Sequence, residues 1–381
     1  MKEQITGRQG LCMATMFLIG SSLVVGAHNE AQQDSWLGIL TGMLFASPII
    51  FIYARMKKLL PEMDLYDILQ YAWGRVLGKI FVALFAWYAL HLGALVIRNF
   101  TEFMSTQAFP ETPQYIPALF MGLLTIYAIK SGQETLGRWS SIFLILVITV
   151  FTFTLLIGTE VYNIDHLKPI ASNGIAPILD GGFSVFTFPF AESVILLLAF
   201  GAFKPGASPY KMFFGALAVG GGIILIGALR NLMILGPVVD LDEYYSSYEA
   251  VKVISLGTFF QRFEVIIGVN LLLCGFVKIA LCLLAAGKGI AKLFGIQGYK
   301  KVSAPTGLLM MILSIFVYGS TMEMFGWLVT YKYYALPFQV ILPVITWIAA
   351  EIKVRRQKKI ISTPGQAEQP PQNPAESGPV Y

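Results

Sequence analysis

The stretch LIGSSLVVG (residues 18–26) places Gly-Ser-Ser in the middle of an apolar run that is otherwise suited to cross a membrane. Glycine costs about 1 kcal/mol relative to alanine inside a helix, and serine side chains compete for backbone hydrogen bonds. A second stretch, TFPFAES (residues 187–193), places Pro189 and Glu192 inside another apolar run. Proline removes a backbone hydrogen bond, and the freed carbonyl groups persist at membrane depth only against protein or a water-filled cavity. Both stretches therefore predict broken helices.

The composition is that of a membrane protein with many spans. Of 381 residues, 56% are hydrophobic and 13% are charged, and the mean hydropathy is +0.68. Soluble domains are typically ~45–50% apolar, and a spanning helix needs roughly 20 mostly apolar residues. The sequence therefore predicts an all-α integral membrane protein with ten transmembrane helices. The predicted spans are residues 10–27, 36–53, 80–108, 116–129, 139–158, 183–203, 212–236, 258–286, 305–322 and 334–352.

The Lys and Arg residues predict the orientation of these spans, because cytoplasmic loops retain them. Of 27 Lys and Arg residues, 20 fall in the two termini and in the loops on the same side, whereas the opposite loops carry only Lys168, Lys252 and Lys332. Both termini are therefore predicted to be cytoplasmic, and the net charge of +5 reflects topology and not nucleic-acid binding. We expect residues 1–356 to form one membrane domain and the Pro- and Gln-rich residues 357–381 to form a disordered cytoplasmic tail.

The two interruptions fall in the first and sixth predicted spans, five spans apart. Because five is odd, the two halves of the chain have opposite orientations, as in a five-plus-five inverted repeat. Interrupted helices at matched positions predict a substrate site near the middle of the bilayer, where half-helix N-termini face a carboxylate and unwound carbonyl groups face a cation. The alternative is that Gly20, Ser21 and Ser22 form a close-packing face for a neighbouring helix.

The same stretches resemble a known family. IGSSLVVG resembles the Gly-Ser-Gly interruption in the first helix of the amino acid–polyamine–organocation superfamily, although Ser22 stands where those permeases usually have Gly. With FPFAES and the long loop PVVDLDEYYSSYEAVKV (residues 237–253), it is similar to the spore germination permeases, the B subunits of GerA-type nutrient germinant receptors. The likeness covers about residues 5–356.

This resemblance implies a LeuT-like fold, with broken first and sixth helices, in the inner membrane of a dormant spore. It implies that a small germinant, often an amino acid, binds beside the breaks, and that net transport is unproven. Its implied partners are an A subunit and a lipoprotein C subunit, in addition to membrane lipid, and no cofactor or nucleic acid is expected. The residues predicted to bind the germinant are Gly20, Ser21, Ser22, Gly26, Phe188, Pro189, Phe190 and Glu192.

Charged residues inside the predicted spans are further candidates, because each costs ~2.5–3.5 kcal/mol at a helix centre. We expect Glu192 to bind a substrate amine, to carry a proton, or to cap the freed backbone. Arg98 and Glu102 lie four residues apart on one helix face and form either a structural salt bridge or an outer gate. Lys278 either takes the place of the sodium ion that related transporters bind between their first and eighth helices, or extends towards the cytoplasmic interface.

The sequence carries neither a cluster of metal ligands nor a supported catalytic arrangement of side chains, so we expect no metal site and no enzyme. The leading hypothesis is a receptor subunit that binds a small nutrient and signals to its partners. A second hypothesis is a proton-coupled amino acid or polyamine symporter that uses Glu192 or Lys278 as its proton-responsive group. A third is a scaffold with a vestigial pocket.

Overall fold

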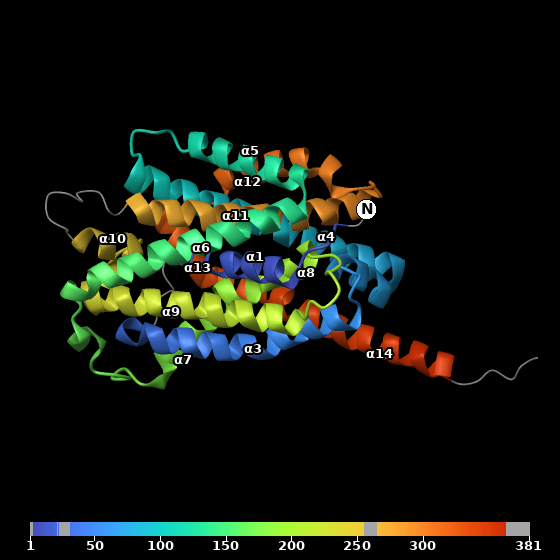
Figure 1. Cartoon of the computed structure of the whole chain (residues 1–381), viewed down its shortest axis with the longest axis horizontal. Coiled ribbons are helices and arrows are strands. Elements are labelled where there is room, and N and C mark those ends of the chain that lie inside the picture. Colours follow the sequence, from blue (N-terminus) through green and yellow to red (C-terminus); the bar gives the residue numbers. More distant parts are fainter. Residues whose placement is uncertain (1–2, 21, 23–30, 255–264, 363–381) are drawn as a thin grey trace, which may run out of the picture.

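The computed structural model describes residues 3–20, 22, 31–254 and 265–362. These residues form a bundle of helices, most of which run along one common direction (Figure 1). The helices are α1 (Gly7–Ile19), α3 (Ser35–Leu59), α4 (Leu65–Phe103), α5 (Tyr115–Ser131), α6 (Gln133–Ile157), α7 (Ile175–Val185), α8 (Val194–Ala199), α9 (Pro209–Asp242), α10 (Ser246–Val253), α11 (Val265–Phe294), α12 (Ser303–Phe316), α13 (Thr321–Leu336) and α14 (Leu342–Ser362).

Many of these helices belong to segments that are suited to cross a membrane. Within the described ranges, seven helical segments are long and apolar enough to do so, and α5 and α12 are shorter apolar helices. The predicted first span is described only as far as Gly20 and at Ser22. The all-α membrane class agrees with the sequence, whereas the number of ten spans stays a prediction.

Several helices begin earlier than the predicted spans. Helix α4 begins at Leu65 and not at residue 80, and α13 begins at Thr321 and not at residue 334. The predicted spans begin where the apolar residues begin. The helices begin earlier, in polar sequence, where the side chains of Asp64 and Ser320 cap their first turns. Inside α4, Gly74 has a φ of 76°, a conformation that favours glycine, and it separates the short first part of the helix from the span.

Helices α1, α8 and α11 lie at the centre of the bundle. All six residues of α8 are buried, as are residues 12–19 of α1 and residues 277–286 of α11. Helix α11 packs against α1, α4 and α8. A stretch of helix that is buried on all sides has protein for neighbours and not lipid, so any polar group on these buried stretches needs a partner inside the protein.

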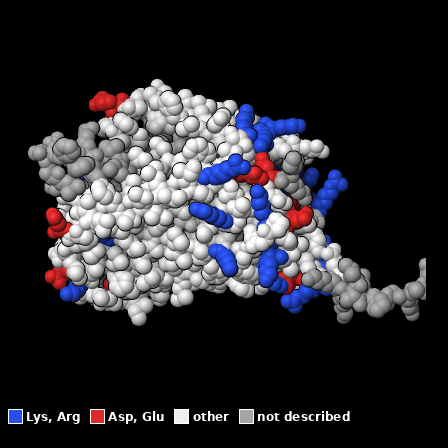
Figure 2. Space-filling model, viewed as in Figure 1, with Lys and Arg blue, Asp and Glu red and all other residues white. Residues whose placement is uncertain are grey.

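Lys and Arg side chains gather at one end of the bundle, the end from which α14 projects (Figure 2). The positions of Lys and Arg in the predicted loops and termini indicate the same one-sided distribution. The assignment of this end to the cytoplasm stays a prediction.

Cysteine labelling tests this orientation, because the three native cysteines, Cys12, Cys274 and Cys282, are buried. Ser172 and Gln297 are exposed in loops that are predicted to lie on opposite sides. In intact cells we expect a membrane-impermeant maleimide to label Ser172→Cys but not Gln297→Cys, and to label both after permeabilisation. If only Gln297→Cys were labelled in intact cells, the orientation would be the opposite of the predicted one.

Candidate functional site

The sixth predicted span is broken in its middle. Between α7 and α8 the chain passes through the π-type turn η5 (Phe186–Phe190) and the short 3₁₀ turn η6 (Ala191–Ser193). Phe188 has non-helical dihedral angles (φ −135°, ψ 109°), and Pro189 has no backbone N–H to donate. Because every residue of both turns is buried, the backbone groups freed here need partners within the protein.

Two side chains from distant helices bind carbonyl groups at this break. The amide Nε2 of Gln339, in the π-type turn η8 (Pro337–Ile341), donates to the Thr187 carbonyl at 2.9 Å. The Tyr53 hydroxyl of α3 donates to the Gln339 carbonyl and lies 3.3 Å from the Ala191 carbonyl. An unpaired buried acceptor costs about 1–3 kcal/mol, so these contacts stabilise the broken conformation.

A fully buried ion pair follows the break. Nζ of Lys278, on α11, lies 2.6 Å from Oε2 of Glu192, and neither side chain has exposed surface. The other carboxylate oxygen, Oε1, accepts from the Tyr331 hydroxyl at 2.6 Å. That hydroxyl lies 3.0 Å from the Tyr88 hydroxyl, which accepts from Nε2 of Gln339 at 2.9 Å. The ion pair and the side chain that holds the break therefore belong to one hydrogen-bonded system, which we call the central network (Tyr53, Tyr88, Glu192, Lys278, Tyr331 and Gln339).

Lys278 also packs against the C-terminal end of α1. Helix α1 ends at Ile19, and Gly20 follows as its C-cap. A Cβ atom on Gly20 would lie 2.5 Å from Cδ of Lys278, so a larger residue here would collide with the lysine stem. The ammonium group lies 5.1 Å from the ring centre of Phe17 and 4.9 Å from that of Phe188. Two aromatic faces, a carboxylate and the negative end of a helix dipole all favour a cation at this place.

Several of the predicted site residues are thus close together. Gly20, Phe188, Glu192 and Lys278 meet where the C-terminal end of α1 approaches the break between α7 and α8. The Lys278 ammonium points into the bundle, which differs from the alternative that it extends to the membrane interface. Its pairing with Glu192 also means that this carboxylate already has a cation.

The remaining predicted binding residues are less directly engaged. The Ser22 hydroxyl donates to a backbone carbonyl four residues earlier, at 3.4 Å. Pro189 and Phe190 are buried within the break. Ser21 and Gly26 lie outside the described residues.

Arg98 and Glu102 form an ion pair elsewhere, at the end of α4. Nη2 of Arg98 lies 2.7 Å from Oε1 of Glu102, and both side chains are largely buried. The carboxylate also accepts from Gln114 at 2.8 Å and from Thr321 at 2.8 Å. These contacts join α4 to the residues before α5 and to the start of α13. The predicted pairing is present, and its role as a bridge or a gate stays a prediction.

Four members of the central network are not predicted by the sequence. Tyr53, Tyr88 and Tyr331 lie in apolar or aromatic runs, where a tyrosine is typical of helix packing. Gln339 carries the clearest signal, because it is a fully buried amide inside a predicted span. Its partners are 152 and 251 residues away along the chain, and no local pattern indicates them.

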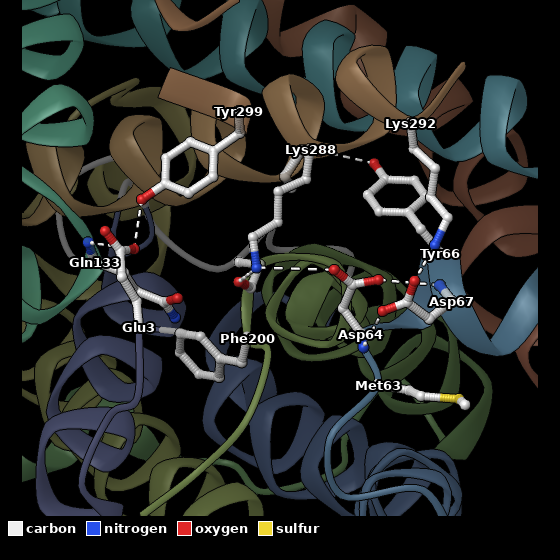
Figure 3. A network of polar contacts seen from close by, with 12 residues as sticks. Glu3, Met63, Asp64, Tyr66, Asp67, Gln133, Phe200, Lys288, Lys292 and Tyr299 are labelled. Carbon is white, nitrogen blue, oxygen red and sulfur yellow. Dashed lines mark hydrogen bonds and ion pairs between the residues drawn. The ribbon is translucent and has the colours of Figure 1, made fainter. Parts of the chain in front are cut away.

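A second polar network lies at the end that is rich in Lys and Arg (Figure 3). Nζ of Lys288, on α11, donates to the Ala199 carbonyl at 2.6 Å and lies 3.8 Å from Oδ2 of Asp64. Nζ of Lys57, on α3, donates to the Phe200 carbonyl at 3.0 Å. Two ammonium groups therefore cap the C-terminal end of α8, where the helix dipole favours cations.

Glu3 joins the residues before α1 to the same end (Figure 3). Its Oε2 accepts from the Tyr299 hydroxyl at 2.6 Å and from the Gln133 N–H at 3.3 Å. Its Oε1 lies 2.9 Å from Nζ of Lys300. Burial alone would raise the pKa of Glu3, but the hydrogen bond from Tyr299 and the charge of Lys300 outweigh burial, so its pKa lies below the ordinary value.

Comparison with known proteins identifies the family. The family described as spore germination protein matches residues 4–320. The chain belongs to this family. Spore germination protein KB of Bacillus subtilis (strain 168) is 27% identical over 363 residues, which cover 94% of this chain and 97% of the relative. Spore germination protein XB of Bacillus anthracis is 22% identical over 280 residues, which cover 70% of this chain and 76% of the relative.

A solved structure supports the fold of this family member. Mhp1, a nucleobase-cation-symport-1 family transporter in a closed conformation with bromovinylhydantoin bound, aligns with a TM-score of 0.69 at 12% identity. The alignment covers 91% of this chain and 78% of Mhp1. At this identity the likeness concerns the fold alone. The predicted family and the LeuT-like transporter fold are therefore confirmed.

Removing the Lys278 ammonium should leave the Glu192 carboxylate buried without a cation. Breaking one partner of a buried pair costs about 3–5 kcal/mol, so we expect Lys278→Ala to lower the unfolding temperature of the purified chain in detergent strongly. Adding Glu192→Gln to Lys278→Ala should recover most of the loss. Methylammonium, which fits the vacated space, should partly restore Lys278→Ala but not the double variant. The exposed Lys130→Ala is the control, and equal losses in the single and double variants would contradict a stabilising pair.

Replacing Glu3 tests the network in Figure 3 by its pH dependence. Because the folded-state pKa of Glu3 is lowered, its stabilising effect is present above the unfolded pKa of about 4.3 and is lost as the pH falls through the folded pKa. At pH 7 we expect Glu3→Gln to unfold ~2–4 °C below the wild type, as for about 1 kcal/mol in a large domain. The difference should shrink below about pH 4. A difference that is constant with pH would show that the charge of Glu3 is not responsible.

Proposed function

We propose that the chain is the B subunit of a spore nutrient-germinant receptor, which binds a small germinant, an amino acid or a similar molecule, at the broken helices in the middle of the membrane. Family membership, the transporter-like fold and the apolar helices support this proposal. We place the subunit in the spore inner membrane, with both termini on the cytoplasmic core side. It works there with an A subunit and a lipoprotein C subunit, and we assign it no catalysis, cofactor or nucleic-acid partner.

The contact between Glu192 and Lys278 carries the proposal. A carboxylate beside two broken helices is suited to bind the ammonium group of an amino acid. In this structure the Lys278 ammonium holds that position at 2.6 Å, between the rings of Phe17 and Phe188. We infer that the germinant ammonium competes with Lys278 for Glu192, so that the buried Glu192 carboxylate keeps a cation. The carboxylate of an amino acid germinant would then pair with the displaced Lys278 ammonium, because a buried charge needs a partner.

Such an exchange gives the receptor two arrangements that differ in a definite contact. With Lys278 on Glu192, α11 is fixed to the break in the sixth span; with the germinant on Glu192, α11 is released from it. Tyr331 bonds the same carboxylate from α13, so a shift of Glu192 reaches α13 directly. A ligand changes the balance of two states only through such a difference in contacts.

A proton-coupled amino acid or polyamine symporter is the second candidate. The transporter fold and a buried carboxylate–ammonium pair, which can exchange a proton, favour it. Sustained accumulation of labelled amino acid by proteoliposomes that contain only this chain, driven by a proton gradient and lost in Glu192→Gln, would favour the symporter. Saturable binding without accumulation would favour the receptor.

The response to germinant tests the role of Glu192. Glu192→Gln keeps the shape of the side chain and can still accept from Tyr331, but it removes the charge. We expect the half-maximal nutrient concentration for germination to rise more than tenfold, which corresponds to at least ~1.4 kcal/mol. The measurement is a germinant dose–response on spores, with the subunit quantified by immunoblot.

A matched control separates charge recognition from a general effect of losing a carboxylate. Asp180 also pairs with a lysine, Lys332, at 2.8 Å, but half of its side chain is exposed. We expect Asp180→Asn to shift the dose–response less than threefold. Normal abundance and an unchanged half-maximal concentration in Glu192→Gln would exclude charge recognition and leave Glu192 as a structural group.

A further inference from the structure

A separate apolar cavity of about 330 Å³ lies where the end of α4 and the π-type turn η2 (Met104–Ala108) face α5 and α11. Among the residues that the structure describes, no charged side chain lines it, and the polar lining consists of the hydroxyl-bearing residues Ser105 and Thr112. The inner wall includes Phe100 and Met121, each only 3% exposed. The cavity shares no lining residue with the central network.

The mouth of this cavity belongs to the surface that faces the bilayer. Phe120, Leu124 and Leu272 line the cavity and are 65%, 53% and 39% exposed. In a membrane protein, apolar side chains that are exposed along the spans contact lipid tails. The cavity therefore continues an established interface, the one between protein and hydrocarbon, into the space between α5 and α11.

We propose that this cavity binds an acyl chain of a bilayer lipid. The described lining residues offer no counter-charge, so an amino acid would leave its charged groups unpaired against them. A helix of another subunit is about 10–12 Å wide with its side chains, which is too wide for a cavity of this volume. A hydrocarbon chain is narrow, needs no hydrogen bonds, and reaches the mouth directly from the membrane.

The bound chain would pack against the segment that carries the Arg98–Glu102 pair. Phe100 and Met104 of the cavity wall flank Glu102 in sequence, and the Ser105 hydroxyl donates to the Glu102 carbonyl at 3.2 Å. Filling the cavity therefore supports the turn after α4 from the lipid side, while Gln114 and Thr321 hold Glu102 from the protein side. This inference does not depend on the identity of the germinant.

Photolabelling with lipid tests the inference on the full-length chain. The purified protein is reconstituted in vesicles of phosphatidylglycerol that carries a diazirine near the end of one acyl chain, irradiated, and digested for mass spectrometry. We expect adducts on inner-wall residues such as Phe100 and Met121, although they are scarcely exposed. Leu272→Trp, which fills the mouth, should reduce these adducts at least fivefold.

Two further variants make the result decisive. Val269 lies on the same helix and is 44% exposed but does not line the cavity, so Val269→Trp should leave inner-wall labelling unchanged. Ile116→Trp fills the cavity from the α5 side and replaces Leu272→Trp if that variant does not fold. The inference is overturned if the wild type is labelled only on exposed residues, or if a folded mouth-filling variant is labelled on the inner wall as strongly as the wild type.

Discussion

The ion pair between Glu192 and Lys278 is the contact on which the rest of the centre depends. Moving two charges out of water costs several kcal/mol each, and their mutual attraction offsets this cost only with close geometry and further hydrogen bonds. The structure supplies both, because Nζ and Oε2 are 2.6 Å apart and Tyr331 donates to the second oxygen. Gly20 makes room for the lysine stem, which gives a physical reason for a glycine at the end of α1.

The interruption of the sixth span has a complementary reason. A continuous helix without proline would satisfy its own backbone and would have no need of Gln339 or Tyr53, whereas Pro189 cannot donate to the preceding turn. Because the helix breaks there, Gln339 bonds both the Thr187 carbonyl and the Tyr88 hydroxyl, so the break and the carboxylate share one amide. A change at either place therefore alters hydrogen bonds at the other, which is the coupling that a ligand-sensing site needs.

The sequence predicts the positions of both breaks but not what meets at them. Gly20 and Pro189 are local signals, since each changes the backbone at its own position. The partner of Glu192 lies 86 residues away on another helix, and only the packing of α11 against α8 selects Lys278 among the lysines of the chain. The sequence does not indicate Tyr331 and Gln339 for the same reason, because their partners also lie far away along the chain. Helix starts at Leu65 and Thr321 were missed because capping side chains, and not hydrophobicity, fix them.

Helix α11 holds α8 at both of its ends. Lys278 pairs with Glu192 just before α8 begins, and Lys288, further along the same helix, donates to the carbonyl of Ala199, the last residue of α8. A six-residue helix that is fixed at both ends to one neighbour moves with that neighbour as a unit. The Lys288 contact is made at the other end of α8 and does not depend on the pair between Glu192 and Lys278. The non-helical backbone at Phe188 separates α7 from this unit. Loss of the central contact would therefore leave the charged end of α8 still joined to α11.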